Sequence, residues 1–160
     1  MKLTALFSAE RVRVNVAVRS KKHAIELAAE NLASAFASVS VNNLFDAMIA
    51  RERLGCTTLG HGVALPHAAL PGLQTSAASV IKFAEPIIFD EDDSTPVSLM
   101  VAMVVPVQTQ SADNDELQQA CDLLSNRERR LQLLGAASET QLLAALRGEA
   151  PAPRLKQARG

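Results

Sequence analysis

The spacing of hydrophobic and polar positions changes several times along the chain, and each change predicts an element. Residues 11–16 alternate polar and apolar side chains, which is typical of a half-buried strand. In residues 21–36 and 41–53 the apolar positions recur at helical spacing, and Ser20 is placed to cap the first of these helices. Residues 96–106 are almost entirely apolar, which predicts a strand buried on both faces at the centre of a sheet.

The middle and the end of the chain have different patterns. Residues 55–71 contain three glycines and two prolines around short apolar runs, so we expect loops and short strands there. Residues 77–83 predict a further strand, and the last third predicts helices at 113–124, 127–134 and 140–146. Helices before and after a set of strands indicate an α/β fold, a single domain whose mixed sheet of about four or five strands is flanked by helices.

Composition and charge exclude several classes of protein. The 160 residues fit one domain, and 16 basic against 17 acidic residues leave a net charge of −1, too little for a nucleic-acid binder. The chain has no Trp and no Tyr, so a platform for stacking bases is not expected. No apolar run reaches about 18 residues, so we expect no membrane insertion. Two cysteines and a start unlike a secretory signal predict a cytoplasmic protein.

Of the three histidines, His67 has the sequence context best suited to chemistry. It follows Pro66 in the run GHGVALPH, which predicts a loop histidine. The glycines upstream in this run have backbone N–H groups that can hold an anion. A neutral imidazole is a nucleophile. These features suit a histidine that accepts a phosphoryl group, with a purely structural loop histidine as the alternative.

Other chemistries find weaker support in the sequence. Cys56, His61 and His67 could supply three metal ligands, but their spacing matches no strong zinc signature. A serine or cysteine hydrolase is disfavoured because the chain has no GxSxG motif and Cys121 falls on the apolar stripe of its predicted helix. The acidic residues 90–93 lack the glycine and distal glutamate of a calcium loop. We therefore expect no metal and no other cofactor.

A longer run carries a family resemblance. Residues 51–67, RERLGCTTLGHGVALPH, resemble the phosphorylation-site signature of IIA components of the bacterial phosphotransferase system, within the fructose/mannitol-type superfamily and its nitrogen-regulatory branch. A second block, PIIFD at 86–90, fits the same family. The resemblance assigns residues 1–147 to one IIA domain, and we expect residues 148–160 to be a disordered tail.

The resemblance implies a role for each matching residue. His67 matches the phosphorylated histidine, and Arg51 matches the active-site arginine that holds the phosphoryl oxygens. Thr57 matches a family hydroxyl that donates to the phosphoryl group or to the imidazole. Gly60 and Gly62 match glycines that keep the loop open and whose backbone binds phosphate.

The resemblance also implies partners. The phosphoryl donor is an HPr-like phosphocarrier, and the regulated targets are other proteins, of the potassium-transport or sensor-kinase type, that bind according to phosphorylation state. No IIB or IIC sequence accompanies the domain, which favours the regulatory branch. A sugar-specific IIA that passes its phosphoryl group to a IIB domain is the alternative.

Departures from the family pattern suggest a further hypothesis. Cys56 replaces the usual Ser, Thr58 the usual Gly, and the alanines at 68–69 the usual Gly-Lys. Asp113 occupies the position of a second active-site histidine. A carboxylate there can orient the His67 imidazole, but it also repels a bound phosphoryl group. The chain could therefore be a binding module with weakened phosphorylation.

Overall fold

The computed structural model describes residues 6–90, 95–107 and 115–149. A short 3-10 helix, six strands and five α-helices form in this part of the chain. They are the 3-10 helix Ala9–Arg11, β1 (Val12–Val16), α1 (Lys21–Ala33), α2 (Val41–Glu52), β2 (Thr58–Gly60), β3 (Val63–Ala64), β4 (His67–Leu70), β5 (Ala77–Ile87), β6 (Val97–Pro106), α3 (Asp115–Ser125), α4 (Arg127–Gly135) and α5 (Glu139–Leu146).

The strands form one mixed sheet, as the sequence predicted. Its order is β1-β5-β6-β3-β2. β4 also pairs with β6, and follows β3 along that strand. β5 and β6 are antiparallel, whereas β1 runs parallel to β5, and both β3 and β4 run parallel to β6. The described residues therefore contain six strands, slightly more than the predicted four or five. The difference arises between residues 58 and 70, where the strands are too short for a pattern of their own.

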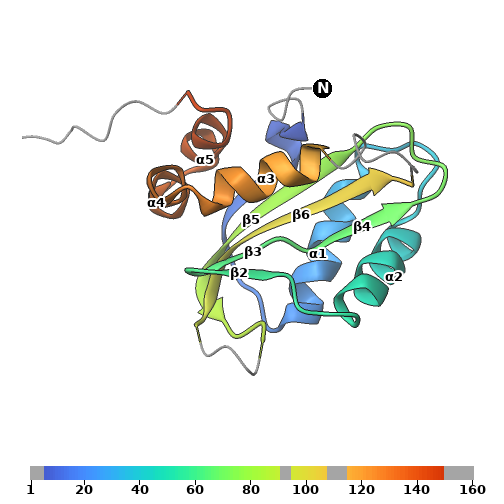
Figure 1. Ribbon diagram of the computed structural model, residues 1–160, viewed down its shortest axis with the longest axis horizontal. Helices are drawn as coiled ribbons and strands as arrows, with labels where there is room; N and C mark the ends of the chain where they lie inside the picture. Colours follow the sequence, from blue (N-terminus) through green and yellow to red (C-terminus); the bar gives the residue numbers. More distant parts are fainter. Residues whose placement is uncertain (1–5, 91–94, 108–114, 150–160) are drawn as a thin grey trace, which may run out of the picture.

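The central strand β6 separates two hydrophobic cores. Leu99 and Val101 face the core that contains α3, α4 and α5, whereas Met100 and Ala102 face the core that contains α1 and α2. Successive side chains of a strand point to opposite faces of the sheet, so an uninterrupted apolar run fills both cores. Figure 1 shows the resulting three layers, with the two groups of helices on opposite sides of the sheet. The prediction of a central strand at 96–106 is confirmed.

The helices begin where their capping residues predict. The Ser20 hydroxyl accepts a hydrogen bond from the backbone N–H of His23 at 3.1 Å. In the same way, the Ser40 hydroxyl accepts from the backbone N–H of Asn43 at 3.0 Å. Each bond satisfies an N–H group that has no partner inside its helix. Ser40 therefore fixes the start of α2, and with it the position of the C-terminal end of this helix relative to the sheet.

Strands β3 and β4 behave as one strand interrupted by a proline. Both pair with β6, β3 at Leu99 and Met100 and β4 from Met103 onward. Pro66 lies between them and has no N–H to donate, but its carbonyl accepts from the backbone N–H of Met103 at 2.9 Å. His67 is consequently the first residue of β4 and not a loop residue, which corrects the expectation from the sequence.

Several sequence expectations fall outside the described residues. They concern most of the acidic run at 90–93, Asp113 with the start of the predicted helix at 113–124, and most of the tail at 148–160. Within the described ranges, no helix is long and apolar enough to cross a membrane.

Candidate functional site

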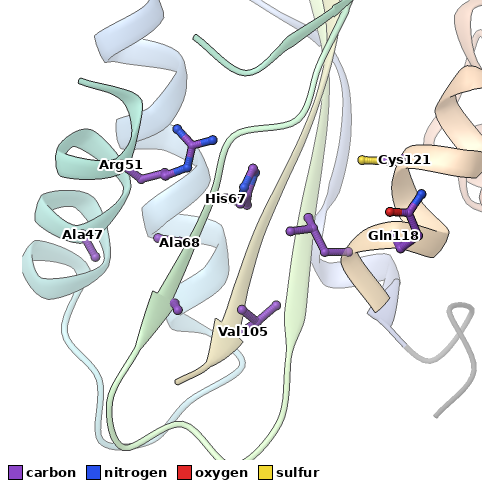
Figure 2. Close-up of a pocket in the computed structure, with 9 residues that line it drawn as sticks. Ala47, Arg51, His67, Ala68, Val105, Gln118 and Cys121 are labelled. Atoms are coloured by element: carbon purple, nitrogen blue, oxygen red, sulfur yellow. The ribbon is translucent and has the colours of Figure 1, made fainter. Parts of the chain in front are cut away.

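A cavity of about 480 Å³ opens beside His67, at the place where the two helical layers approach each other across the edge of the sheet. α2 contributes one wall, β4 and the end of β6 form the floor, and α3 contributes the opposite wall. Its lining residues are Ala47, Arg51, His67, Ala68, Ala69, Val105, Leu117, Gln118 and Cys121. Figure 2 shows Arg51 next to His67 on one side, with Gln118 and Cys121 facing them from α3.

One hydrogen bond sets the chemical state of the His67 ring. Its Nδ1 lies 2.9 Å from the carbonyl oxygen of Leu65. A carbonyl oxygen only accepts hydrogen bonds, so Nδ1 of the neutral ring carries the proton and donates it. The lone pair is then on Nε2, and the half-buried ring lines the cavity. In the neutral ring, Nε2 is therefore the nucleophilic nitrogen.

Arg51 supplies the positive charge of the cavity. Its side chain is half-buried on the last turn of α2, and Nη1 donates to the carbonyl oxygen of Gly55 at 3.0 Å. No other arginine or lysine is found among the described residues that line the cavity. A guanidinium has five N–H donors, so those not bonded to Gly55 can bind an anion at His67.

The wall on α3 contains two polar side chains that the sequence reasoning missed. Gln118 donates from Nε2 to Asp122 Oδ1 at 3.0 Å. Cys121 packs against the core, as its position on the apolar stripe indicated, but it also lines the cavity. Burial, reinforced by the charge of Asp122, raises the pKa of the Cys121 thiol. Helical spacing put both residues on one face of α3, but only the tertiary fold turns that face towards His67.

Thr57 is not among the described residues that line the cavity. Thr57 is buried, and its hydroxyl donates to Glu52 Oε1 at 2.8 Å. Its backbone N–H donates to Glu52 Oε2 at 3.1 Å. Sequence reasoning missed Glu52, although it stands next to Arg51 in the matched motif.

The motif glycines form a tight turn between β2 and β3. Gly60, His61 and Gly62 have φ angles of 80°, 57° and 84°, all in the left-handed region that glycine adopts readily. Neither glycine lines the cavity beside His67. The Gly62 carbonyl accepts from the backbone N–H of Ser98 at 2.9 Å, which fixes the turn against β6. The phosphate-binding role of the two glycines stays a prediction.

The residues considered for a metal site do not come together in the described part of the chain. Within these ranges no group of three or more His, Cys, Asp or Glu side chains is arranged to hold a metal ion. His61 and Cys56 are both exposed. The Cys56 sulfur lies 3.8 Å from the Thr58 hydroxyl.

The fold and the site define a class, namely α/β domains of the mannitol-type IIA fold. The crystal structure of IIA mannitol from Escherichia coli matches with a TM-score of 0.70 at 20% identity, over 88% of this chain and 98% of that one. The family model for the phosphoenolpyruvate-dependent sugar phosphotransferase system, EIIA 2, matches residues 5–148, and the chain belongs to this family.

The more similar relatives are nitrogen regulatory proteins. One from Pseudomonas aeruginosa is 30% identical over 142 residues, which cover 89% of this chain and 92% of the relative. The crystal structure of nitrogen regulatory protein IIA-Ntr from Neisseria meningitidis matches with a TM-score of 0.82 at 30% identity, over 90% of this chain and 98% of that one. The chain is therefore a IIA-type component with nitrogen regulatory homologues.

Proposed function

We propose that this chain is a cytoplasmic phosphocarrier of the nitrogen-regulatory type, which accepts a phosphoryl group on Nε2 of His67 from a phosphorylated HPr-like protein. The observation that carries the proposal is the pairing of two groups in one cavity. His67, whose neutral ring has its lone pair on Nε2, and Arg51 both line it. The matched family and the regulatory relatives support the same reading.

The chemistry follows from the environment of the ring. The Nε2 lone pair forms the new bond to phosphorus while the bond between phosphorus and the donor's nitrogen breaks, and its electron pair stays with the donor. Positive charge then grows on the His67 ring, and the carbonyl of Leu65 stabilises it through the Nδ1 proton. The Arg51 guanidinium binds the phosphoryl oxygens, which spread the negative charge of the transition state. Positioning and charge suffice, so the proposal includes no metal.

Phosphorylation changes the charge at the mouth of the cavity, which is how the proposed regulation operates. A phosphoryl group adds about two negative charges. A partner that binds the unmodified surface then meets repulsion, and one with a basic surface gains attraction. We infer that potassium-transport or sensor-kinase proteins are the regulated targets, by analogy with the family.

Transfer of radioactive phosphate tests the proposal. We expect wild-type protein incubated with labelled phosphoenolpyruvate, enzyme I and an HPr-like carrier to become labelled, and His67→Ala to remain unlabelled. His61→Ala is the control, because His61 is exposed and outside the cavity. Arg51→Ala should lower the initial rate by about 100-fold. Arg53→Ala, at an exposed position two residues away, should leave the rate unchanged.

A second candidate, the binding module with weakened phosphorylation, draws on the composition of the cavity wall. Among the described lining residues, Arg51 is the only arginine or lysine, and the positions after His67 on β4 are alanines, Ala68 and Ala69. That candidate predicts little or no label on the wild type, with retained partner binding. The sugar-specific alternative predicts labelling followed by rapid loss of the phosphoryl group to a IIB protein.

A further inference from the structure

Glu52 is a buried carboxylate next to Arg51, and three donors from two other segments converge on it. Its side chain is 3% exposed. Besides the two bonds from Thr57, Glu52 Oε2 lies 3.4 Å from Lys21 Nζ, at the start of α1. A buried charge is costly unless its lone pairs are satisfied. Glu52 therefore fastens the end of α2 to α1 and to the loop that leads into β2.

Hydrogen bonds continue from Glu52 to His67. Thr57, whose N–H is held by Glu52, accepts from the backbone N–H of Leu65 at 2.9 Å through its own carbonyl. The Leu65 carbonyl in turn accepts from His67 Nδ1 at 2.9 Å. The position of the imidazole is thus linked to the Glu52 carboxylate through two residues.

The same loop also holds the guanidinium. Arg51 precedes Glu52 on α2, and its Nη1 donates to the carbonyl of Gly55, which lies between Glu52 and Thr57 in the chain. If the bonds from Thr57 to the Glu52 side chain are lost, residues 53–57 keep only backbone bonds, among them that of the Gly55 N–H to the Glu52 carbonyl at 3.2 Å. The carbonyl of Gly55 is then held less firmly as the acceptor that orients Arg51.

We propose that Glu52 is a positioning residue for phosphoryl transfer, which sets the distance between the Arg51 guanidinium and Nε2 of His67. This inference rests on the proposed function. Glu52 itself is not among the residues that line the cavity. In-line transfer is sensitive to placement, and an error of about 1 Å can cost about 100-fold in rate.

Two substitutions at one position separate its hydrogen bonds from its charge. Glu52→Met keeps the volume and removes every bond. Glu52→Gln removes the charge and keeps the three partners, because an amide oxygen in the place of Oε2 accepts from the Thr57 N–H and from Lys21 Nζ, and the amide nitrogen donates to the Thr57 hydroxyl. We expect Glu52→Met to lower the rate of single-turnover transfer from the phosphorylated carrier by at least about tenfold. Glu52→Gln should restore the rate to within about threefold of wild type.

A double-mutant cycle distinguishes positioning from general stability. In an Arg51→Ala background, Glu52→Met should lower the rate by a clearly smaller factor than in the wild-type background, because no guanidinium is left to place and only the imidazole is affected. The stability control is Arg130→Met. Arg130 is buried, and its guanidinium donates to the carbonyls of Leu124 and Ser125, at 3.2 Å each, at the C-terminal end of α3; none of these three residues lines the cavity. This variant should lower Tm without changing the transfer rate per folded molecule.

Nuclear magnetic resonance of the Arg51 guanidinium supplies a readout that does not need phosphorylation. We expect distinct ¹⁵N signals in wild type and Glu52→Gln, and averaged signals in Glu52→Met. A Glu52→Met protein with wild-type rate and unaveraged signals would overturn the inference, as would an equal loss of rate in both Arg51 backgrounds. Absence of label on the wild type would instead remove the proposed function, and the Arg51 signals would then decide the role of Glu52 alone.

Discussion

At the level of single residues, the two nitrogens of the His67 ring differ in their role. Nδ1 donates to the Leu65 carbonyl, and this leaves the lone pair of the neutral ring on Nε2. A single backbone carbonyl thus selects the tautomer. No sequence motif specifies that bond directly, because it depends on the backbone path of Leu65 and Pro66 between β3 and β4.

The raised pKa of Cys121 gives a prediction at the same scale. A thiol whose pKa is above its ordinary value keeps its proton to higher pH, so less thiolate is present at pH 8. We expect iodoacetamide to modify the exposed Cys56 at least about tenfold faster than the half-buried Cys121. Raising the pH should then accelerate the modification of Cys121. Peptide mass spectrometry after timed alkylation measures both rates, and equal rates at pH 8 would contradict the prediction.

The sequence alone was enough to identify some residues of the site but not others. Arg51 and His67 belong to one continuous motif, so resemblance identified both as site candidates, and the structure brings them to one cavity. Gln118 and Cys121 are more than 50 positions further along the chain from His67. Their place in the cavity depends on how α3 packs over the sheet, which no local pattern determines. Glu52 was missed because a charged residue at a helix end is usually exposed.

At the level of elements, the sequence predicted features that depend on local signals more accurately than features that depend on strand pairing. The helices at 21–33 and 41–52 begin where the sequence predicted, because a cap and a periodicity are both local. The strand predicted at 77–83 continues to Ile87 in β5. Its last part is exposed and irregular, with a shift of register against β6 between Lys82 and Ile87, so the apolar pattern ends before the strand does.

The contact between α4 and α5 yields a prediction about elements. Arg129 on α4 donates from Nη2 to the carbonyls of Ala145 and Leu146 at 3.1 and 3.3 Å, at the C-terminal end of α5. A cation there also interacts favourably with the helix dipole. We expect Arg129→Met to lower the free energy of unfolding by about 1–2 kcal/mol in urea titrations. Arg127→Met, at an exposed position of the same helix, should change it by less than about 0.5 kcal/mol.

At the level of the whole molecule, stability depends on two cores joined by β6. Leu99 is fully buried in the core on the side of α3, α4 and α5. We expect Leu99→Ala to lower the free energy of unfolding by about 2–5 kcal/mol, from lost burial and the cavity it leaves. Tm should fall by roughly 5–15 °C in calorimetry.

Leu131 provides the matched control for this substitution. It is the same residue type on α4, but 52% of it is exposed. Leu131→Ala should therefore leave Tm within about 2 °C of wild type. A similar drop in both variants would show that the effect of Leu99 does not come from burial.

The cavity beside His67 has walls from both helical layers, Arg51 on one side and Gln118 with Cys121 on the other. A phosphoryl group there would add about two negative charges to a chain whose formal net charge is −1. The electrostatic potential would change on two separate outer surfaces at once, around α2 and around α3. Two different proteins, one binding on the α2 side and the other on the α3 side, could therefore detect the same phosphorylation without competing for one binding surface.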